Sequence, residues 1–413
     1  MLQKHDLKSA IPVSGVERRQ PQPSMLPAWF LALGTFAIGT EGFMIAPLLP
    51  TISADLGMSL SATAMLVVVF TLVLALSSPI ATVVTGALRR RDTLLLAMTI
   101  FTIGNLIAAF APGFGTLMFA RILMAVAAGL YAPNANALAG MIVPTEKRGR
   151  ALAIVSGGMT IAIALGLPLG SIIGHAFGWR STFIMVAAMG AIAIIGILAG
   201  VGRNAGAHMT IASLAERIGV IRQAPVLKLL SVTLFWSMGA YTAYPYIAPY
   251  LSQTLGFADK GIAATVTLWG VFAALGVFTG GVLNDRFGSL KVASLSLVAL
   301  ALSFAGLAVA TKLPGAAAVS LALLAIAGWG FSVWSFFPAQ MARLIVAGGH
   351  NHASVALSLN TSTMYLGFSI GSAIGAGIIA VGDVWMIGAA AAVMEIIALA
   401  LDEAWKHTKS SSR

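Results

Sequence analysis

The chain has 413 residues, of which 59% are hydrophobic and only 9% are charged. Soluble proteins carry about 25% charged residues, so this composition excludes a soluble protein and is typical of a polytopic helical membrane protein. The formal net charge of +11 does not indicate nucleic-acid binding, because the basic residues sit in short clusters between apolar runs. The absence of cysteine excludes disulfides and thiolate metal sites.

The chain begins with a polar, proline-containing stretch at 1–25, in which we expect a cytoplasmic tail rather than a signal peptide. A helix needs about 20 apolar residues to cross the hydrocarbon core, and runs of that size predict twelve spans. They lie at 26–48, 62–85, 93–110, 116–140, 151–173, 181–202, 228–251, 261–283, 291–310, 316–338, 354–380 and 385–402.

The longest loop, 203–227, separates the sixth span from the seventh and contains an amphipathic stretch. It predicts one six-helix bundle at 26–202 and a second at 228–404, followed by a tail at 405–413. The loops after the second and eighth spans resemble each other, GALRRRDTLL and GGVLNDRFGSLK, as expected for two related halves. The predicted fold class is therefore an all-α membrane protein with twelve transmembrane helices in two pseudo-symmetric six-helix bundles.

The basic residues predict the orientation of these spans. With the amino terminus inside, 20 of the 24 Lys and Arg residues fall in cytoplasmic segments. Arg180, Lys260 and Lys312 fall outside, and Arg121 lies within the fourth span. By the positive-inside rule, both termini are expected in the cytoplasm.

Patterned spacings of Gly, Pro and charge occur in three places. The loop after the eighth span contains a G-x-x-x-D-R-x-G-x-x-K pattern, whose residues are Gly281, Asp285, Arg286, Gly288 and Lys291. The loop after the second span keeps Gly86 and Arg89 but lacks the acidic residue at its expected place. The fifth span contains Gly157, Gly166, Pro168 and Gly170.

These residues, with FARILMAVAAGL in the fourth span, resemble the major facilitator superfamily and its twelve-span drug:proton antiporter branch. The resemblance implies the major facilitator fold, and it assigns the two loops and the fifth span to gating and helix packing. AYTAYPYIAPYL, GWGFSVWSFFPAQ and SLNTSTMYLGFSIGSAIG most resemble bacterial purine-base efflux pumps. Sugar and chloramphenicol efflux relatives share much of the first half.

Two charges fall inside predicted spans, Glu41 in the first and Arg121 in the fourth. Such residues usually face a cavity, form pairs or carry protons, because an isolated charge is costly in the bilayer. In the resembled fold the first, fourth, seventh and tenth spans line the central cavity, so Glu41 and Arg121 can approach each other and couple protons to substrate. A permanent structural ion pair is the alternative. Glu395 in the twelfth span is a third intramembrane charge, for which packing or snorkelling competes with a coupling role.

Aromatic and amide residues concentrate in the same helices and suit a flat heteroaromatic substrate, although they suit helix packing as well. The candidate cavity residues are Asn134, Trp236, Tyr241, Tyr244, Trp334, Gln340 and Asn360. His350 and His352 lack a third ligand, and no metal site is expected.

The sequence contains no H-E-x-x-H or Walker A motif, so an enzyme is not expected. We predict a proton-coupled antiporter of the bacterial inner membrane that exports purine bases or nucleosides by alternating access. Chloramphenicol-type drugs or sugars are the alternative substrates, and symport uptake or a passive channel are further alternatives. The proton gradient would drive transport without a cofactor. The expected partners are a small organic substrate, protons and the lipid bilayer, with no nucleic acid, and the protein is expected to act as a monomer.

Overall fold

The structure is a computed structural model that describes residues 25–85, 88–203, 205 and 214–410. The predicted tail 1–24, Gly86, most of the 203–213 segment and residues 411–413 lie outside the described residues. Within the described part, twelve helical stretches are long and apolar enough to cross a membrane, so the predicted all-α fold with twelve spans is confirmed. The domain boundaries stay a prediction.

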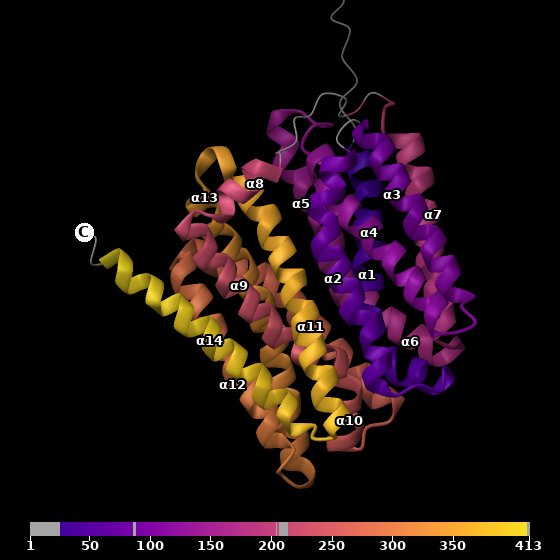
Figure 1. Ribbon diagram of the computed structural model, residues 1–413, viewed down its shortest axis with the longest axis vertical. Coiled ribbons are helices and arrows are strands. Elements are labelled where there is room, and N and C mark those ends of the chain that lie inside the picture. The colour runs from indigo at the N-terminus through magenta and orange to yellow at the C-terminus, as the bar shows by residue number, and fades with distance from the viewer. Residues whose placement is uncertain (1–24, 86–87, 204, 206–213, 411–413) are drawn as a thin grey trace, which may run out of the picture.

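The amino-terminal half of the chain forms seven helices (Figure 1). They are α1 (Leu26–Asp55), α2 (Leu60–Val84), α3 (Arg90–Ala109), α4 (Phe114–Ala139), α5 (Arg148–Ile161), α6 (Leu167–Phe177) and α7 (Trp179–Gly200). A short α8 (Leu214–Ile221) follows, and the carboxy-terminal half then contains α9 (Ala224–Ala243), α10 (Ile247–Leu255), α11 (Asp259–Phe287), α12 (Ser289–Ala310), α13 (Gly315–Val381) and α14 (Trp385–Ser410). The long α13 is two spans, because Gly349 has a non-helical backbone with φ of 68°.

Three spans depart from the simple predicted helices, each at a proline. α1 continues through Pro47 and Pro50 to Asp55, seven residues beyond its predicted end at 48. Pro47 and the residues that follow stay in the helix because Leu48, Leu49 and Ile52 are buried against the rest of the bundle, and packing offsets the lost backbone hydrogen bonds. Span five is α5 and α6 joined by a π-helical segment at 162–166, and span seven is α9 and α10 joined by a 3-10 turn at 244–246.

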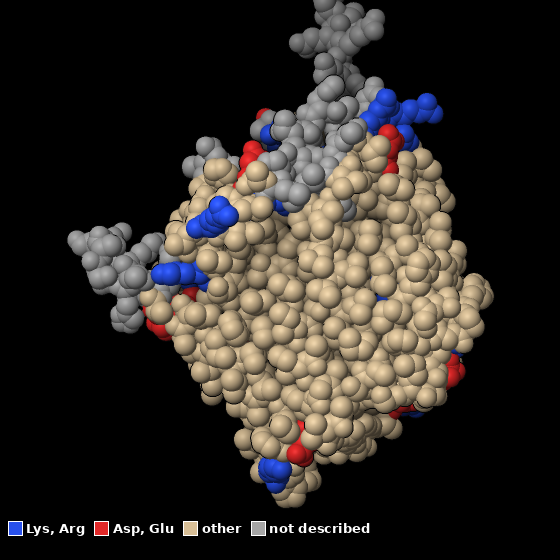
Figure 2. All heavy atoms as spheres, viewed as in Figure 1, with Lys and Arg blue, Asp and Glu red and all other residues tan. Residues whose placement is uncertain are grey.

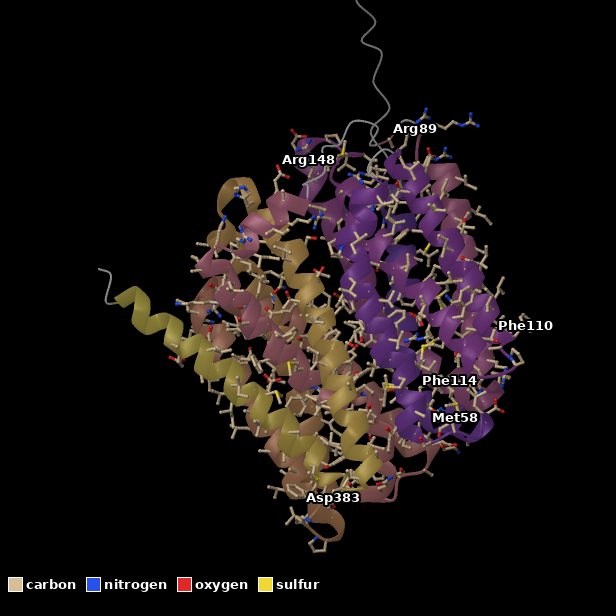
Figure 3. All side chains as sticks on the ribbon, viewed as in Figure 1. Met58, Arg89, Phe110, Phe114, Arg148 and Asp383 are labelled. Atoms are coloured by element: carbon tan, nitrogen blue, oxygen red, sulfur yellow. The ribbon has the colours of Figure 1, made fainter. Side chains whose placement is uncertain are left out.

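The two ends of the molecule differ from its middle. Arg89 and Arg148 lie at one end, here called the terminal face because α1 begins there, whereas Met58, Phe114 and Asp383 lie at the other, the far face (Figure 3). On the face shown in Figure 2, charged side chains lie mostly toward the two ends and the margins, and the surface between them is almost entirely uncharged. An uncharged band bounded by charge is what a lipid-facing surface requires.

The same glycine packing joins helices within each half. In the first half, a Cβ atom on Gly170 of α6 would lie 2.6 Å from the Met44 Cβ atom on α1. In the second half, a Cβ atom on Gly375 of α13 would lie 2.6 Å from the Thr242 carbonyl oxygen on α9. No side chain fits at these distances, so the glycines let the helix pairs pack closely, as their spacing predicts.

The halves contact each other between the middle of the membrane and the far face. The Ser61 hydroxyl donates to the Ala376 carbonyl oxygen at 2.9 Å, and the Ser369 hydroxyl donates to the Val68 carbonyl oxygen at 2.9 Å. The α2 helix packs on α13, and α6 packs on α11. These contacts close the far-face entrance between the halves.

Candidate functional site

A buried ion pair joins α1 to α4 in the amino-terminal half. Arg121 donates from Nη1 to Glu41 Oε1, and both side chains are 0% exposed. Arg121 is held further by a 3.3 Å hydrogen bond from Nε to the Leu66 carbonyl oxygen. Its guanidinium lies over the Phe70 ring, 3.9 Å from the ring centroid. The two intramembrane charges that the sequence pairs by hypothesis are therefore in direct contact.

The pair is incompletely hydrogen-bonded. Glu41 Oε2 and Arg121 Nη2 are buried, and neither atom has a hydrogen-bond partner among the described residues. Buried polar atoms are normally satisfied, and exceptions concentrate at functional sites. One acceptor on Glu41 and one donor on Arg121 thus remain for a proton, water or ligand.

The pair lies directly behind a cavity wall. Gly42 and Phe43, which follow Glu41 along α1, line a small cavity, and Phe70 under Arg121 lines it too. Tyr241 and Tyr365 form its wall on the carboxy-terminal side.

A second small cavity, here called the aromatic cavity, shares Phe43 and Tyr241 with the first. Its lining residues are Phe43, Trp236, Ala240, Tyr241, Tyr244, Trp269, Trp329, Val333, Trp334 and Phe368. The rings pack on one another, with the Tyr244 and Trp269 centroids 4.8 Å apart and the Trp269 and Trp329 centroids 5.6 Å apart. Only Phe43 comes from the amino-terminal half.

Four tryptophans of the aromatic cavity share one further property. The indole N–H groups of Trp236, Trp269, Trp329 and Trp334 are buried and lack a hydrogen-bond acceptor in the described part of the chain. By contrast, Trp179 outside the cavity donates to Asp55 Oδ2 at 3.1 Å. Tyr244 is also satisfied, because its hydroxyl donates to the Phe43 carbonyl oxygen at 2.9 Å.

The structure divides the seven predicted cavity residues. Trp236, Tyr241, Tyr244 and Trp334 line the aromatic cavity. Asn134, Gln340 and Asn360 do not line either cavity, because their amides bond to neighbouring helices. Asn134 Oδ1 accepts from Arg90 Nη1 at 2.5 Å, whereas Gln340 Nε2 and Asn360 Oδ1 both bond the Thr233 hydroxyl, at 3.0 and 2.7 Å.

Other lining residues escape sequence reasoning. Phe43 could have been predicted from the sequence, because it lies two residues after Glu41 on the same helix and therefore at a similar depth in the membrane. Trp269 lies on α11, a span that the resemblance does not place at the cavity. Phe368 stacks on Tyr241 with ring centroids 3.6 Å apart, yet it lies in an apolar run without a distinguishing signal.

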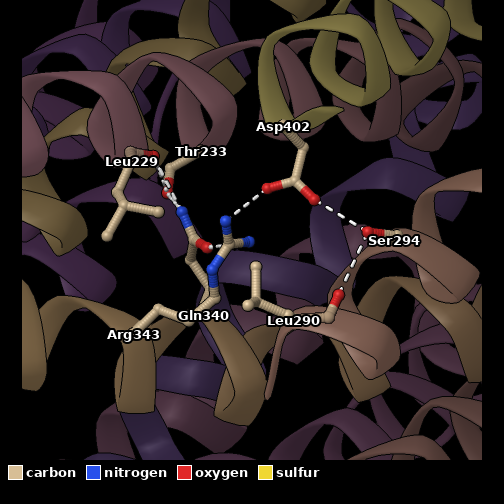
Figure 4. Close-up of polar contacts among 7 residues, drawn as sticks. All are labelled: Leu229, Thr233, Leu290, Ser294, Gln340, Arg343 and Asp402. Atoms are coloured by element: carbon tan, nitrogen blue, oxygen red, sulfur yellow. Dashed lines mark hydrogen bonds and ion pairs between the residues drawn. The ribbon is translucent and has the colours of Figure 1, made fainter. Parts of the chain in front are cut away.

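A polar cluster near the terminal face was not predicted (Figure 4). Arg343 of α13 donates to Asp402 Oδ1 of α14, and the Ser294 hydroxyl of α12 donates to Asp402 Oδ2 at 2.8 Å. Arg343 Nη1 also donates to Gln340 Oε1 at 3.3 Å. The cluster connects α9, α12, α13 and α14. The sequence places Arg343 among the basic residues of cytoplasmic segments and does not predict its buried ion pair with Asp402.

The predicted gate residues lie at the terminal face or in helix contacts. Asp285, Arg286 and Lys291 are exposed, with the Arg286 guanidinium and the Lys291 ammonium 5.3 and 5.7 Å from the Phe287 ring. Gly288 has a φ of 84° and separates α11 from α12, a conformation that favours glycine. The described Gly281 faces open space. Arg89 is exposed directly before α3, while its neighbour Arg90 is buried.

The fifth-span residues differ in their contacts. Gly166 packs against Thr40 and Gly170 against Met44, whereas nothing lies within 4 Å of a Cβ atom built on Gly157. Pro168 follows the π-helical segment and is buried. A proline ring clashes with the carbonyl four residues earlier, so the wider π turn accommodates Pro168 within the span.

The comparisons with known proteins agree with this architecture. The family model of the Major Facilitator Superfamily matches residues 31–372. The chain belongs to the major facilitator superfamily. It is therefore a multi-pass membrane transporter with the major facilitator fold, as the resemblance implies.

The described residues contain no group of three or more His, Asp or Glu residues placed to hold a metal ion.

Relatives of this major facilitator protein are transporters. YbcL, an MFS-type transporter of Bacillus subtilis (strain 168), is 30% identical over 383 residues, which cover 90% of this chain and 94% of that protein. The inner membrane transport protein YdhP of Escherichia coli (strain K12) is 29% identical, covering 86% of this chain and 89% of that protein. A chloramphenicol resistance protein of Streptomyces lividans is 29% identical over 63% of this chain and 67% of its own length.

Solved structures share the fold at lower identity. The nucleoside transporter NupG superposes with a TM-score of 0.73 at 12% identity, covering 92% of this chain and 99% of that one. A POT family transporter in complex with a thioalcohol-conjugated peptide superposes with a TM-score of 0.73 at 14% identity, covering 92% and 96%. At these identities the likeness concerns the fold alone.

Proposed function

We propose that this chain is a proton-coupled antiporter that exports small organic solutes across the bacterial inner membrane by alternating access. The observation that carries this proposal is the buried Glu41–Arg121 pair, in which each partner keeps one polar atom without a hydrogen bond. An intramembrane carboxylate with a replaceable cation partner is suited to binding and releasing a proton. The pair lies beside the cavity to which a solute would bind.

In the proposed mechanism, substrate and proton compete through this pair. Protonation of Glu41 removes its negative charge and its attraction for Arg121, and substrate binding weakens. Deprotonation restores the ion pair and the substrate-binding form. Because Phe43 follows Glu41 and lines both cavities, a shift of Glu41 toward or away from Arg121 is transmitted to the wall that a substrate contacts.

The aromatic cavity supports a flat heteroaromatic substrate. Its tryptophan and tyrosine rings offer stacking faces, and its four unsatisfied indole N–H groups require acceptors. Ring nitrogens and carbonyl oxygens of purine bases or nucleosides supply both features, and these are the preferred substrates. Chloramphenicol-type drugs are the second candidate, which the relative in Streptomyces lividans favours, and sugars are a third.

The direction of transport follows from the proposed orientation. Basic residues such as Arg89, Arg148 and Lys291 lie at the terminal face, which the positive-inside rule assigns to the cytoplasm. With the far-face entrance closed, a substrate reaches the cavity from the cytoplasmic side. The loop at 281–291 and the glycines of span five then serve the gate that opens and closes this side during rocking.

The test uses inverted membrane vesicles, acidified inside by respiration, with a dye that reports lumenal pH. Purines, nucleosides, chloramphenicol-type drugs and sugars are added separately to the outside. We expect purines to alkalinise the lumen in the wild type and in Glu146→Gln, which changes an exposed glutamate, but not in Glu41→Gln. A response only to drugs or sugars would select the alternative substrates. No response to any of these compounds, or a full response in Glu41→Gln, would contradict the proposal.

A further inference from the structure

Glu395 of α14 is a second carboxyl group deep in the protein. Its side chain is 0% exposed, which excludes snorkelling to the membrane surface. Neither Oε1 nor Oε2 has a hydrogen-bond partner among the described residues. Glu41, by comparison, has an arginine on one oxygen. The proposed function uses Glu41 and leaves Glu395 without a role.

The carboxyl group occupies a space that a glycine leaves open. A Cβ atom on Gly239 of α9 would lie 2.5 Å from Glu395 Oε1 and 3.0 Å from the Ala391 carbonyl oxygen. Any larger residue at 239 would displace the acid. Gly239 and Glu395 therefore form a pocket of matched shape between α9 and α14.

No described cation is placed to neutralise Glu395. The basic residues of the packed helices lie near the terminal face, with Lys228 at the start of α9 and Lys291 at the start of α12. On α14 itself, Asp402 lies seven residues further, two turns along the same face, and Arg343 already pairs with it. A carboxylate without a partner is unfavourable in such an environment, so burial favours the protonated form of Glu395 in this conformation.

The pocket shares a helix with the aromatic cavity. Gly239 faces Glu395, while the next residue, Ala240, and Trp236 one turn earlier line the aromatic cavity. A ligand that displaces α9 from one side therefore changes the space around Glu395 on the other. Further along α14, the cluster of Asp402, Ser294 and Arg343 provides polar groups toward the terminal face.

We propose that Glu395 is a second proton-binding site, located in the carboxy-terminal half, that is loaded in the far-closed conformation and releases its proton when a ligand in the aromatic cavity displaces α9 from α14. On release, the O–H bond breaks, the proton passes to water at the terminal side, and the carboxylate remains. This inference rests on the proposed function, because it assumes proton-coupled transport in which the Glu395 proton moves once in each cycle.

The first arm of the test needs no substrate. Infrared spectra of the purified full-length protein report the C=O stretching band of protonated carboxyl groups, which carboxylates lack. We expect Glu395→Gln to lose one such band that Glu41→Gln retains. Gly239→Ala should shift the same band, whereas the matched Gly377→Ala, with no atom within 4 Å of its new Cβ, should not. A spectrum unchanged by Glu395→Gln would show an ionised group and overturn the proposal.

The second arm measures protons moved per substrate in proteoliposomes. We expect Glu395→Gln to exchange one proton fewer than the wild type while Gly377→Ala matches it. Wild-type stoichiometry in Glu395→Gln would overturn the coupling role of Glu395 and leave Glu41 as carrier. If the wild type moves no protons although the infrared band is present, the proposed antiport itself fails, so the two failures are distinguishable.

Discussion

The two halves of this protein have similar helix packing but different chemistry. The amino-terminal half holds the Glu41–Arg121 ion pair and contributes one ring, Phe43, to the aromatic cavity. The carboxy-terminal half supplies all the other rings of that cavity and buries Glu395 behind it. The difference suggests a division in which the amino-terminal half places an ion pair beside the cavity and the carboxy-terminal half recognises the solute, with Phe43 as the contact between them.

The largest expected effect comes from breaking the ion pair on its cationic side. Arg121→Leu leaves a buried Glu41 without a partner, which typically costs about 3 to 5 kcal/mol. We expect a strong loss of thermal stability in detergent and no transport. Combining Glu41→Gln with Arg121→Leu should recover much of the stability without restoring coupling. Equal instability of the single and double variants would contradict the role of the pair.

Glycine packing tests whether the halves are equivalent as scaffolds. Gly170→Ala on α6 and Gly375→Ala on α13 each force a Cβ atom to within 2.6 Å of the facing helix. Overpacking of this kind costs about 1 to 3 kcal/mol, so both variants should lower the melting temperature by similar amounts. Gly157→Ala is the control, because its Cβ atom meets open space. A lower melting temperature in only one of the two variants would show that the two halves are not equivalent as scaffolds.

A smaller effect is expected from the indole N–H groups. Trp269→Phe keeps a ring in the aromatic cavity but removes a donor, and one hydrogen bond contributes about 0.5 to 1.5 kcal/mol. Purine affinity, measured by calorimetry, should therefore fall about twofold to tenfold. Trp179→Phe is the control in the other half, where the indole bonds Asp55. Unchanged affinity in Trp269→Phe would mean that the substrate does not use these donors.

Sequence reasoning reached the helices and the charged pair but not the full cavity. Hydropathy predicts the spans because each must be apolar over its whole length, and the rarity of intramembrane charge points to Glu41 and Arg121. The walls of the cavity depend on which way each helix faces. α11 lies outside the four spans that the resemblance places at the cavity, so Trp269 was not predicted to line it.

The polar residues near the terminal face show a second limit. Gln340 and Asn360 were expected in the cavity because amides near the aromatic residues suit a heteroaromatic substrate. In the structure they bond Thr233. The Arg343–Asp402 pair joins residues 59 positions apart, so neither local spacing nor composition connects them. Long-range pairs of this kind emerge only when the helices are packed together.

The central claim is competition between proton and substrate at Glu41, and proton release on binding tests it most directly. Purine is added to purified protein in lightly buffered detergent solution containing a pH-sensitive dye. Near the pH at which Glu41 is partly protonated, we expect binding to release more protons in the wild type than in Glu41→Gln, which should bind weakly at every pH. Equal proton release in both proteins, or substrate binding by the wild type without any release across the pH range, would contradict the account.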